Sequence, residues 1–315
     1  MISQILDLSD TVARIAAGEI LSIAGPEALL AQLPQGHWIG GATAFAMTPD
    51  GVLRLDDHLC VTRFPEAIAT TIRHLPTPAL ASLAKGYAPG GLTLILIPAF
   101  STAHSAFALD AMGYPGLFDQ PLTGWISGTD TGQIGTAFNG ATGLGHADGT
   151  VVMHLTLPAG RTTSLKITNP FTPSRDPAKT FRFPTTGFTV TGAMVGSQTV
   201  NLARYLTAVG LDPRLPFVTN LAGTLINVAI RSVDTDKGEV SFYAPVVEGA
   251  GYHLANPLPD DPAAPAQPPT VYGCGDITQH RRMGGTGAFT GPLSFGQIAY
   301  ILLNQTVVTL DIAPD

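Results

Sequence analysis

The stretch that decides the fold runs from residue 270 to residue 315. It reads T-V-Y-G-C-G-D (270–276), then the glycine-rich G-G-T-G-A-F-T-G-P-L (284–293), and it closes with S-F-G-Q-I-A-Y-I-L-L-N-Q-T-V-V-T-L-D-I (294–312). Residues 307–312 are β-branched and alternate near their end, which is typical of a half-buried strand. The polar residues 304–306 can turn the chain into it. We therefore expect a closing strand that belongs to the core.

Length and composition indicate a compact protein rich in turns or in buried strands. A chain of 315 residues buries roughly three quarters of the surface that it exposes when unfolded. Charged residues make up only 12% of the chain, and 35 glycines and 26 prolines are present. An average globular protein has about 25% charged residues. Many residues must therefore lie in turns or on strands that are buried on both faces.

Charge and hydropathy argue against two classes of partner. The net charge is -7 and the longest basic run is Arg281-Arg282, which argues against binding to nucleic acid. The first ten residues lack the basic and apolar regions of a signal peptide. The longest apolar run, residues 92–100, has the length of a strand and cannot span a membrane. We expect a cytoplasmic protein without a membrane partner.

The order of local patterns predicts a mixed α/β (α+β) fold with two sheet-containing halves packed together. Residues 1–34 are expected to form a helical lead-in, and residues 35–168 the first half. The proline-rich segment N-P-F-T-P-S-R-D-P-A-K-T-F-R-F-P (residues 169–184) is interpreted as a linker. Residues 185–315 are expected to form the second half.

Several elements within these halves are predicted individually. Residues 92–100 read as a buried strand, followed by a helix over 102–112 that is capped by Ser101 or Thr102. The other expected elements are a strand over 150–157, a helix over 201–209 ended by Gly210, and a helix within 65–85 interrupted by prolines.

Three glycine-rich segments lie at or near the ends of predicted strands. They are residues 40–41, 140–145 and 273–275. Glycine lets another backbone or a ligand approach closely, because it has no Cβ. Ligands of α/β proteins usually bind at strand ends. Either a ligand or another strand could therefore approach Gly40 and Gly41.

The chain resembles the FIST-domain family over most of its length. The second half carries the closer likeness, in N-L-A-R-Y-L-T-A-V-G-L-D-P (201–213), E-V-S-F-Y-A-P (239–245), V-V-E-G (246–249) and the closing F-G-Q-I and N-Q-T. The first half is similar through I-G-G-A-T (39–43) and F-N-G-A-T-G-L-G (138–145). Gln297 stands where the family usually has a glutamate.

The resemblance implies a two-part ligand-binding domain of signalling systems, some members of which bind haem and respond to nitric oxide. Together with the glycine pattern it implies a ligand site, a small-molecule ligand and a signalling partner protein. The expected ligand-binding residues are Gly40, Gly41, Asn139, Gly140, Gly273, Cys274, Gly275 and Gln297.

Familiar catalytic motifs are missing from the sequence. There is no G-x-S-x-G, and the nearest segment, W-I-S-G-T (125–129), lacks the first glycine. Residues 140–145 give G-x-x-G-x-G, the wrong order for a dinucleotide fingerprint, and there is no Walker A sequence. A serine hydrolase and a nucleotide-binding enzyme are therefore weakly supported.

Histidines are the remaining candidates for metal or haem ligation, although none has a familiar metal-binding spacing. The candidates are His58, His146 and His253. On a strand, Asp56 would share a face with His58 and could orient its imidazole, although a solvated strand edge explains the same residues. Likewise, His146 with Asp148 is also explained by a glycine turn.

The two cysteines, Cys60 and Cys274, are too few for a disulfide framework and are interpreted as reduced structural thiols. The glycines around Cys274 could instead expose its sulfur as a haem or redox ligand. The leading hypothesis is a small-molecule-binding sensory protein with haem as a candidate ligand. The alternative is a haem- or metal-dependent enzyme that uses His, Asp and Cys residues in a cleft between the halves.

Overall fold

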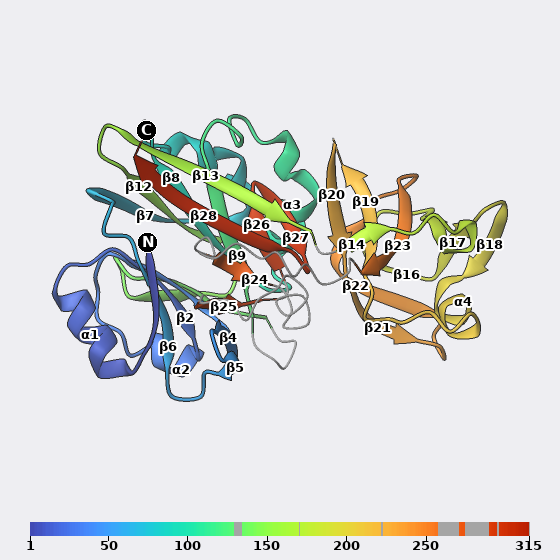
Figure 1. Ribbon diagram of the computed structural model, residues 1–315, viewed down its shortest axis with the longest axis horizontal. Helices are drawn as coiled ribbons and strands as arrows, with labels where there is room; N and C mark the ends of the chain where they lie inside the picture. The colour runs from blue at the N-terminus through green and yellow to red at the C-terminus, as the bar shows by residue number, and fades with distance from the viewer. Residues whose placement is uncertain are drawn as a thin grey trace.

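The protein is strand-rich and consists of a body with an inserted lobe. The computed structural model describes residues 1–128, 134–169, 171–221, 223–257, 271–274, 290–294 and 296–314. The described residues within 1–168 and 271–314 form three sheets, which we call the body. Residues 171–257 form two further sheets, which we call the insert. Figure 1 shows the insert beside the body, which carries both chain termini.

The first body sheet includes the beginning of the chain. Its order is β1 (Ile2–Leu6), β6 (Leu59–Arg63), β2 (Leu21–Gly25), β3 (Trp38–Ala42), β10 (Ala137–Asn139) and β11 (Leu144–His146). Helices α1 (Leu8–Ala16) and α2 (Glu27–Leu30) connect the first strands. The helical lead-in expected over residues 1–34 is thus only partly helical, because β1 and β2 pair with β6 in this sheet.

The second body sheet contains a parallel strand pair bridged by a helix. Its order is β27 (Ile301–Asn304), β26 (Gly296–Ala299), β9 (Leu122–Ser127), β8 (Leu92–Pro98), β12 (Thr150–Thr156) and β7 (Ala69–Leu75). Helix α3 (Thr102–Asp110) joins β8 to β9, and Ser101 caps it by accepting a hydrogen bond from the His104 N–H at 3.1 Å. The predictions for residues 92–100, 102–112 and 150–157 are confirmed.

The helix expected within residues 65–85 is wrong for its first part, and its second part is a 3₁₀ helix. Residues 69–75 form strand β7, which pairs along its whole length with β12. Pro76 then precedes a 3₁₀ segment, η1 (Thr77–Gly86), and η2 (Ala111–Gly113) is a second one after α3. The tertiary pairing with β12 overrides the local helical tendency, and the prolines mark the change of structure at residues 76–78.

The third body sheet joins strands from both ends of the chain. Its order is β13 (Arg161–Thr168), β28 (Val307–Pro314), β24 (Val271–Cys274), β25 (Gly291–Leu293), β4 (Phe45–Thr48) and β5 (Gly51–Arg54). The closing strand β28 pairs with β13 from Thr168↔Val307 to Arg161↔Pro314. Leu310 is fully buried and Val308 nearly so. The expected closing core strand is therefore confirmed.

The insert is a pair of small antiparallel sheets. The larger has the order β18 (Gln198–Asn201), β17 (Gly192–Val195), β15 (Thr180–Arg182), β23 (Gly251–Pro257), β19 (Phe217–Leu221) and β20 (Thr224–Val228), with β14 (Phe171–Pro173) also on β23. The smaller has the order β16 (Gly187–Val190), β22 (Glu239–Val246) and β21 (Ile230–Asp234). Helix α4 (Leu202–Ala208), capped by Asn201, confirms the prediction for 201–209, and η3 (Pro177–Lys179) is a short 3₁₀ turn.

Two expected boundaries do not match the sheets. Residues 169–184 contribute β14 and β15 to the insert, because Phe181 and Phe183 are buried in its aromatic core, and so they are not a free linker. Nor do residues 35–168 and 185–315 carry separate sheets. Strand β28 pairs with β13, β25 with β4 and β26 with β9, so the end of the chain completes sheets begun by its first half.

The body and the insert share a continuous apolar core. One cluster of buried side chains includes Ile97 and Phe107 of the body together with Phe181 and Phe242 of the insert. The polar turn 304–306 adds directed contacts: Asn304 Oδ1 accepts from the Ala229 N–H at 3.4 Å, and Gln305 O accepts from Asn227 Nδ2 at 3.1 Å.

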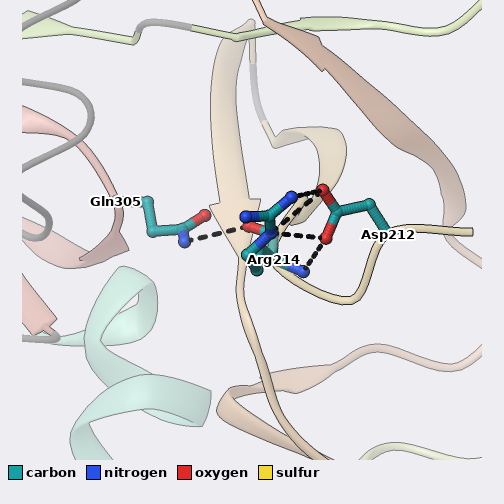
Figure 2. Close-up of polar contacts among 3 residues, drawn as sticks. All are labelled: Asp212, Arg214 and Gln305. Atoms are coloured by element: carbon teal, nitrogen blue, oxygen red, sulfur yellow. Dashed lines mark hydrogen bonds and ion pairs between the residues drawn. The ribbon is translucent and has the colours of Figure 1, made fainter.

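Figure 2 shows a third contact of this turn. Gln305 Nε2 donates to Arg214 O at 3.3 Å, while the Arg214 guanidinium pairs with Asp212. Gln305 adopts a left-handed backbone conformation, with φ of 46°. Residues other than glycine adopt this backbone conformation only where neighbouring groups stabilise it. The turn is therefore held by hydrogen bonds to three residues of the insert: Ala229, Asn227 and Arg214.

The first prediction concerns β28. Replacing Leu310 by alanine should lower the free energy of unfolding by about 2–5 kcal/mol, because it removes a fully buried side chain between two paired strands. Urea unfolding measures the change. The matched control is Asp311→Ala, an exposed neighbour that should change stability by no more than about 0.5 kcal/mol. Equal effects of the two substitutions would contradict the assigned burial.

Candidate functional site

Two of the predicted ligand residues, Gly41 and Gln297, lie beside one buried side chain, Trp125 of β9. Gly41 lies directly over it, since a Cβ on Gly41 would stand 2.8 Å from Trp125 Nε1. Gln297 of β26 is the cross-strand partner of Trp125. We call Gly41, Trp125 and Gln297, with the hydroxyls of Thr43, Ser127 and Ser294, the β9 centre. The sequence analysis did not predict a role for Trp125. The signal available in the sequence was a large aromatic residue next to small ones, Gly124 and Ser127.

Gln297 carries the most informative group of the β9 centre. Its side chain is fully buried, and its Nε2 donates to Ser294 O. Its Oε1 has no hydrogen-bond donor among the residues that the structure describes. A buried acceptor without a partner costs about 1–3 kcal/mol, so buried polar groups are nearly always satisfied. This amide oxygen therefore lacks, among the described residues, the donor that a buried acceptor normally has.

Three hydroxyl groups form hydrogen bonds between the strand ends next to this amide. Ser127 Oγ accepts from the Ala42 N–H at 2.7 Å and donates to Thr136 O. Thr43 Oγ1 donates to Leu293 O at 2.7 Å, and Ser294 Oγ to Ile126 O at 2.6 Å. These bonds tie together the carboxyl ends of β3 and β9, where ligands of α/β sheets usually bind.

At the other predicted glycines of the first sheet, protein atoms occupy the space beside the Cα atom. A Cβ on Gly40 would lie 2.9 Å from the Trp38 ring, and one on Gly140 would lie 2.3 Å from Trp38 O. Asn139 Oδ1 accepts from the Ala141 N–H at 3.0 Å and shapes the turn between β10 and β11. Close approach of neighbouring chain segments thus accounts for Gly40, Asn139 and Gly140 without a ligand.

The remaining predicted ligand residues belong to the segment 273–275. Gly273 and Cys274 lie on β24, which pairs with β28 and β25. Gly275 lies outside the described residues. Strand β24 also contacts β9, so its backbone borders the β9 centre. Cys60, the other cysteine, is a buried free thiol whose pKa is raised by burial to about 12, which confirms its structural interpretation.

The three histidines proposed as metal ligands lie apart from one another in the fold. His58 Nδ1 lies 2.5 Å from Asp57 Oδ1, whereas Asp56 pairs with Arg54. The expected Asp56–His58 pair is wrong, because residues 55–58 lie between β5 and β6 and do not alternate as in a strand. His253 Nδ1 lies 3.2 Å from Thr180 Oγ1 in the insert.

His146 stacks on His74, with ring centroids 3.7 Å apart and planes within 5°. Burial and the nearby His74 lower the pKa of His146. Burial alone would raise the pKa of Asp148, but hydrogen bonds from the Ala103 and Gly149 N–H groups hold it below its usual value. Asp148 thereby caps α3 from another loop. No group of three His, Cys, Asp or Glu side chains in the described ranges is arranged to hold a metal ion.

A hollow of about 500 Å³ lies away from the β9 centre and is lined by residues 18–20 before β2, by the end of β6, by the start of β7 and by the segment between β6 and β7. An ion pair crosses it, with Arg63 Nε 2.6 Å from Glu19 Oε2. Arg14 Nη1 reaches Glu19 Oε1 at 3.2 Å. Glu19 balances only one of the two guanidinium charges. Arg14, the second arginine, does not line the hollow, so the charged residues of the lining are the pair Glu19 and Arg63.

A second prediction tests whether Trp125 requires glycine at position 41. Gly41→Ala should lower the free energy of unfolding by about 1–3 kcal/mol, because the new methyl group would overlap the indole. It should also shift the tryptophan fluorescence of the folded protein. Gly113→Ala is the control, since no atom lies within 4 Å of a Cβ there. A stable variant with unchanged fluorescence would contradict the packing.

A third prediction concerns two buried histidines that sequence reasoning did not single out as functional. Burial lowers the pKa of both His104 and His154 to about 4, from an ordinary value of 6.5. As pH falls below 6.5, the unfolded chain binds protons that the folded chain does not. Stability is therefore complete above pH 6.5 and falls toward pH 4, by up to about 1.4 kcal/mol per pH unit for each histidine.

His154→Gln removes one of these protonation sites and should make the stability loss between about pH 7 and pH 5 smaller by about 1–2 kcal/mol. Urea unfolding at the two pH values measures it. His104→Gln should act in the same direction. Parallel pH profiles for the wild type and both variants would show that neither histidine is held neutral by burial.

In the described part of the chain, no helix has both the length and the apolar character needed to cross a membrane. No curated protein matches the sequence. A model of a family of unknown function, DUF6976, matches residues 6–313 and so spans the body and the insert together. That description assigns no activity. The chain belongs to the DUF6976 family.

Proposed function

We propose that this protein is an intracellular sensor that binds a small organic molecule at the β9 centre. The observation that carries the proposal is the fully buried Gln297 amide, whose Oε1 has no donor among the described residues. A ligand N–H or O–H group would supply it. The hydroxyl-rich strand ends of β3 and β9 beside this amide support the same location.

The surroundings define the chemistry of the ligand. The Trp125 indole beside Gln297 is apolar, planar and buried, and Gln297 Oε1 requires a hydrogen-bond donor. A neutral molecule with a flat apolar part and one hydroxyl or amine group satisfies both. The site contains no charged side chain among its six named residues, so a strongly ionic ligand would lose solvation without compensation.

The fold also provides a route from this ligand to a signalling partner. Strand β26, which carries Gln297, forms a hairpin with β27, and β27 ends at Asn304. Asn304 and Gln305 are hydrogen-bonded to the insert through Ala229, Asn227 and Arg214. A ligand that favours one position of the hairpin would thus favour one position of the insert, which is how binding shifts a conformational equilibrium.

The fourth prediction tests the ligand site. A thermal-shift screen of neutral aromatic alcohols and amines should give compounds that raise the melting temperature, since ligand at 100 times its Kd stabilises by about 2.7 kcal/mol. Titration calorimetry should show at least tenfold weaker binding to Gln297→Leu. Gln198→Leu, an exposed substitution on β18, should leave the affinity unchanged.

Two outcomes would contradict the proposal. Compounds that bind Gln297→Leu as tightly as the wild type would occupy another site. A Gln297→Leu protein that is more stable than the wild type, with no compound binding to either, would show that Gln297 is only an imperfect core residue. A haem titration followed by visible spectra tests haem directly, since a Soret band lost in Gln297→Leu would make haem the molecule bound here.

A further inference from the structure

A second hollow lies on the insert, on the sheet that contains β15 and β17, whereas Gln297 lies on β26 of a body sheet. Its volume is about 270 Å³, the size of a small metabolite rather than of a large cofactor. The residues that line it are Arg175, Pro177, Thr180, Phe181, Arg182, Met194 and Gly196. We call it the arginine hollow.

The sheet register explains how these side chains meet. Thr180 and Arg182 are two residues apart on β15 and share its outer face, while Phe181 between them is buried. Arg182 lies directly across from Met194 of β17. Thr180 lies across from His253 of β23 and contacts its ring nitrogen. One exposed sheet face thus carries an arginine, a methionine, a threonine and a histidine.

The second arginine is held over this face by an anchored loop. Ser174 N donates to Leu254 O at 2.9 Å, and the Tyr205 hydroxyl donates to Ala178 O at 2.8 Å. Asp176 Oδ1 accepts from the Ala178 N–H at 2.9 Å. These bonds anchor the backbone on both sides of Arg175, whose side chain is exposed.

The two arginines of the hollow have no carboxylate partner among the residues that the structure describes. Four other arginines, Arg14, Arg54, Arg63 and Arg214, each pair with a carboxylate. Neither Arg175 nor Arg182 has such a pair among the described residues, and Arg182 makes one hydrogen bond, from Nη1 to Gly249 O at 2.8 Å. Arg73, Arg161, Arg204 and Arg231 also have no carboxylate pair among the described residues. Arg175 and Arg182 differ from them in lining one hollow together, in a chain of net charge -7.

We infer that the arginine hollow binds a small organic anion, with its phosphate or carboxylate group on Arg175 and Arg182 and its apolar part on Met194. Guanidinium groups match the geometry of both anions and bind them through paired N–H groups. Met194, which is 42% exposed, provides the flexible apolar contact. This site is independent of the β9 centre.

The fifth prediction uses phenyl phosphate and benzoate as probes, with inorganic phosphate as the group without an apolar part. Calorimetry on the full chain should show that the arginine pair variant R175Q/R182Q binds phenyl phosphate at least tenfold more weakly than the wild type. Met194→Ala should weaken phenyl phosphate binding but not phosphate binding. Whichever of phenyl phosphate and benzoate binds more tightly identifies the anion class.

The matched control is R161Q/R204Q, which removes two positive charges from β13 and α4, outside the hollow. It should bind the probes as the wild type does. Thermal melting checks that both double variants are folded. An equal loss of affinity in the two double variants would show that the probes respond to overall charge and not to this hollow. Unchanged affinity in R175Q/R182Q would overturn the assignment. So would the absence of binding of any probe at millimolar concentration. Gln297→Leu should have no effect, which separates this site from the sensor proposal.

Discussion

The structure depends on hydrogen-bond ladders between strands that are far apart in the sequence. Strand β28 pairs with β13 on one side and with β24 on the other. The insert leaves the body at the end of β13 and returns at the start of β24, so both of its connections begin beside the same closing strand. The entropy of closing such a long loop grows only slowly with its length. A lobe of 171–257 can therefore be accommodated without disturbing the body sheets.

The same long-range pairing decides what the sequence could and could not predict. Local signals were sufficient for the strand at 92–98, for the Ser101 cap of α3 and for the closing strand, because each depends on neighbouring residues. The identity of the strand with which a segment pairs is not encoded in the residues next to that segment. The division into halves failed for this reason, since 291–304 reads like the end of an independent domain yet pairs with β4 and β9.

The candidate site shows a similar limit. The glycine pairs indicated close approach, but their residue type does not say whether a ligand or an indole fills the space. Trp38 and Trp125 fill it at Gly40 and Gly41. Gln297 was found through a family resemblance, whereas its significance depends on burial and on an acceptor without a described donor, which only coordinates reveal. For His58, the partner proved to be Asp57 because the chain turns where a strand was expected.

A backbone distortion at the boundary between body and insert bears on how the two parts communicate. Phe100 follows β8 with φ of 58°, a left-handed conformation that costs a non-glycine residue about 1 kcal/mol or more. The body holds it through the N–H bond to His104 Nδ1 at 3.1 Å. The insert holds it through Arg231, whose guanidinium carbon lies 4.2 Å from the Phe100 ring centroid. Phe100, just before α3, is therefore in contact with both parts of the molecule: its backbone is hydrogen-bonded to the body, and its ring packs against an arginine of the insert.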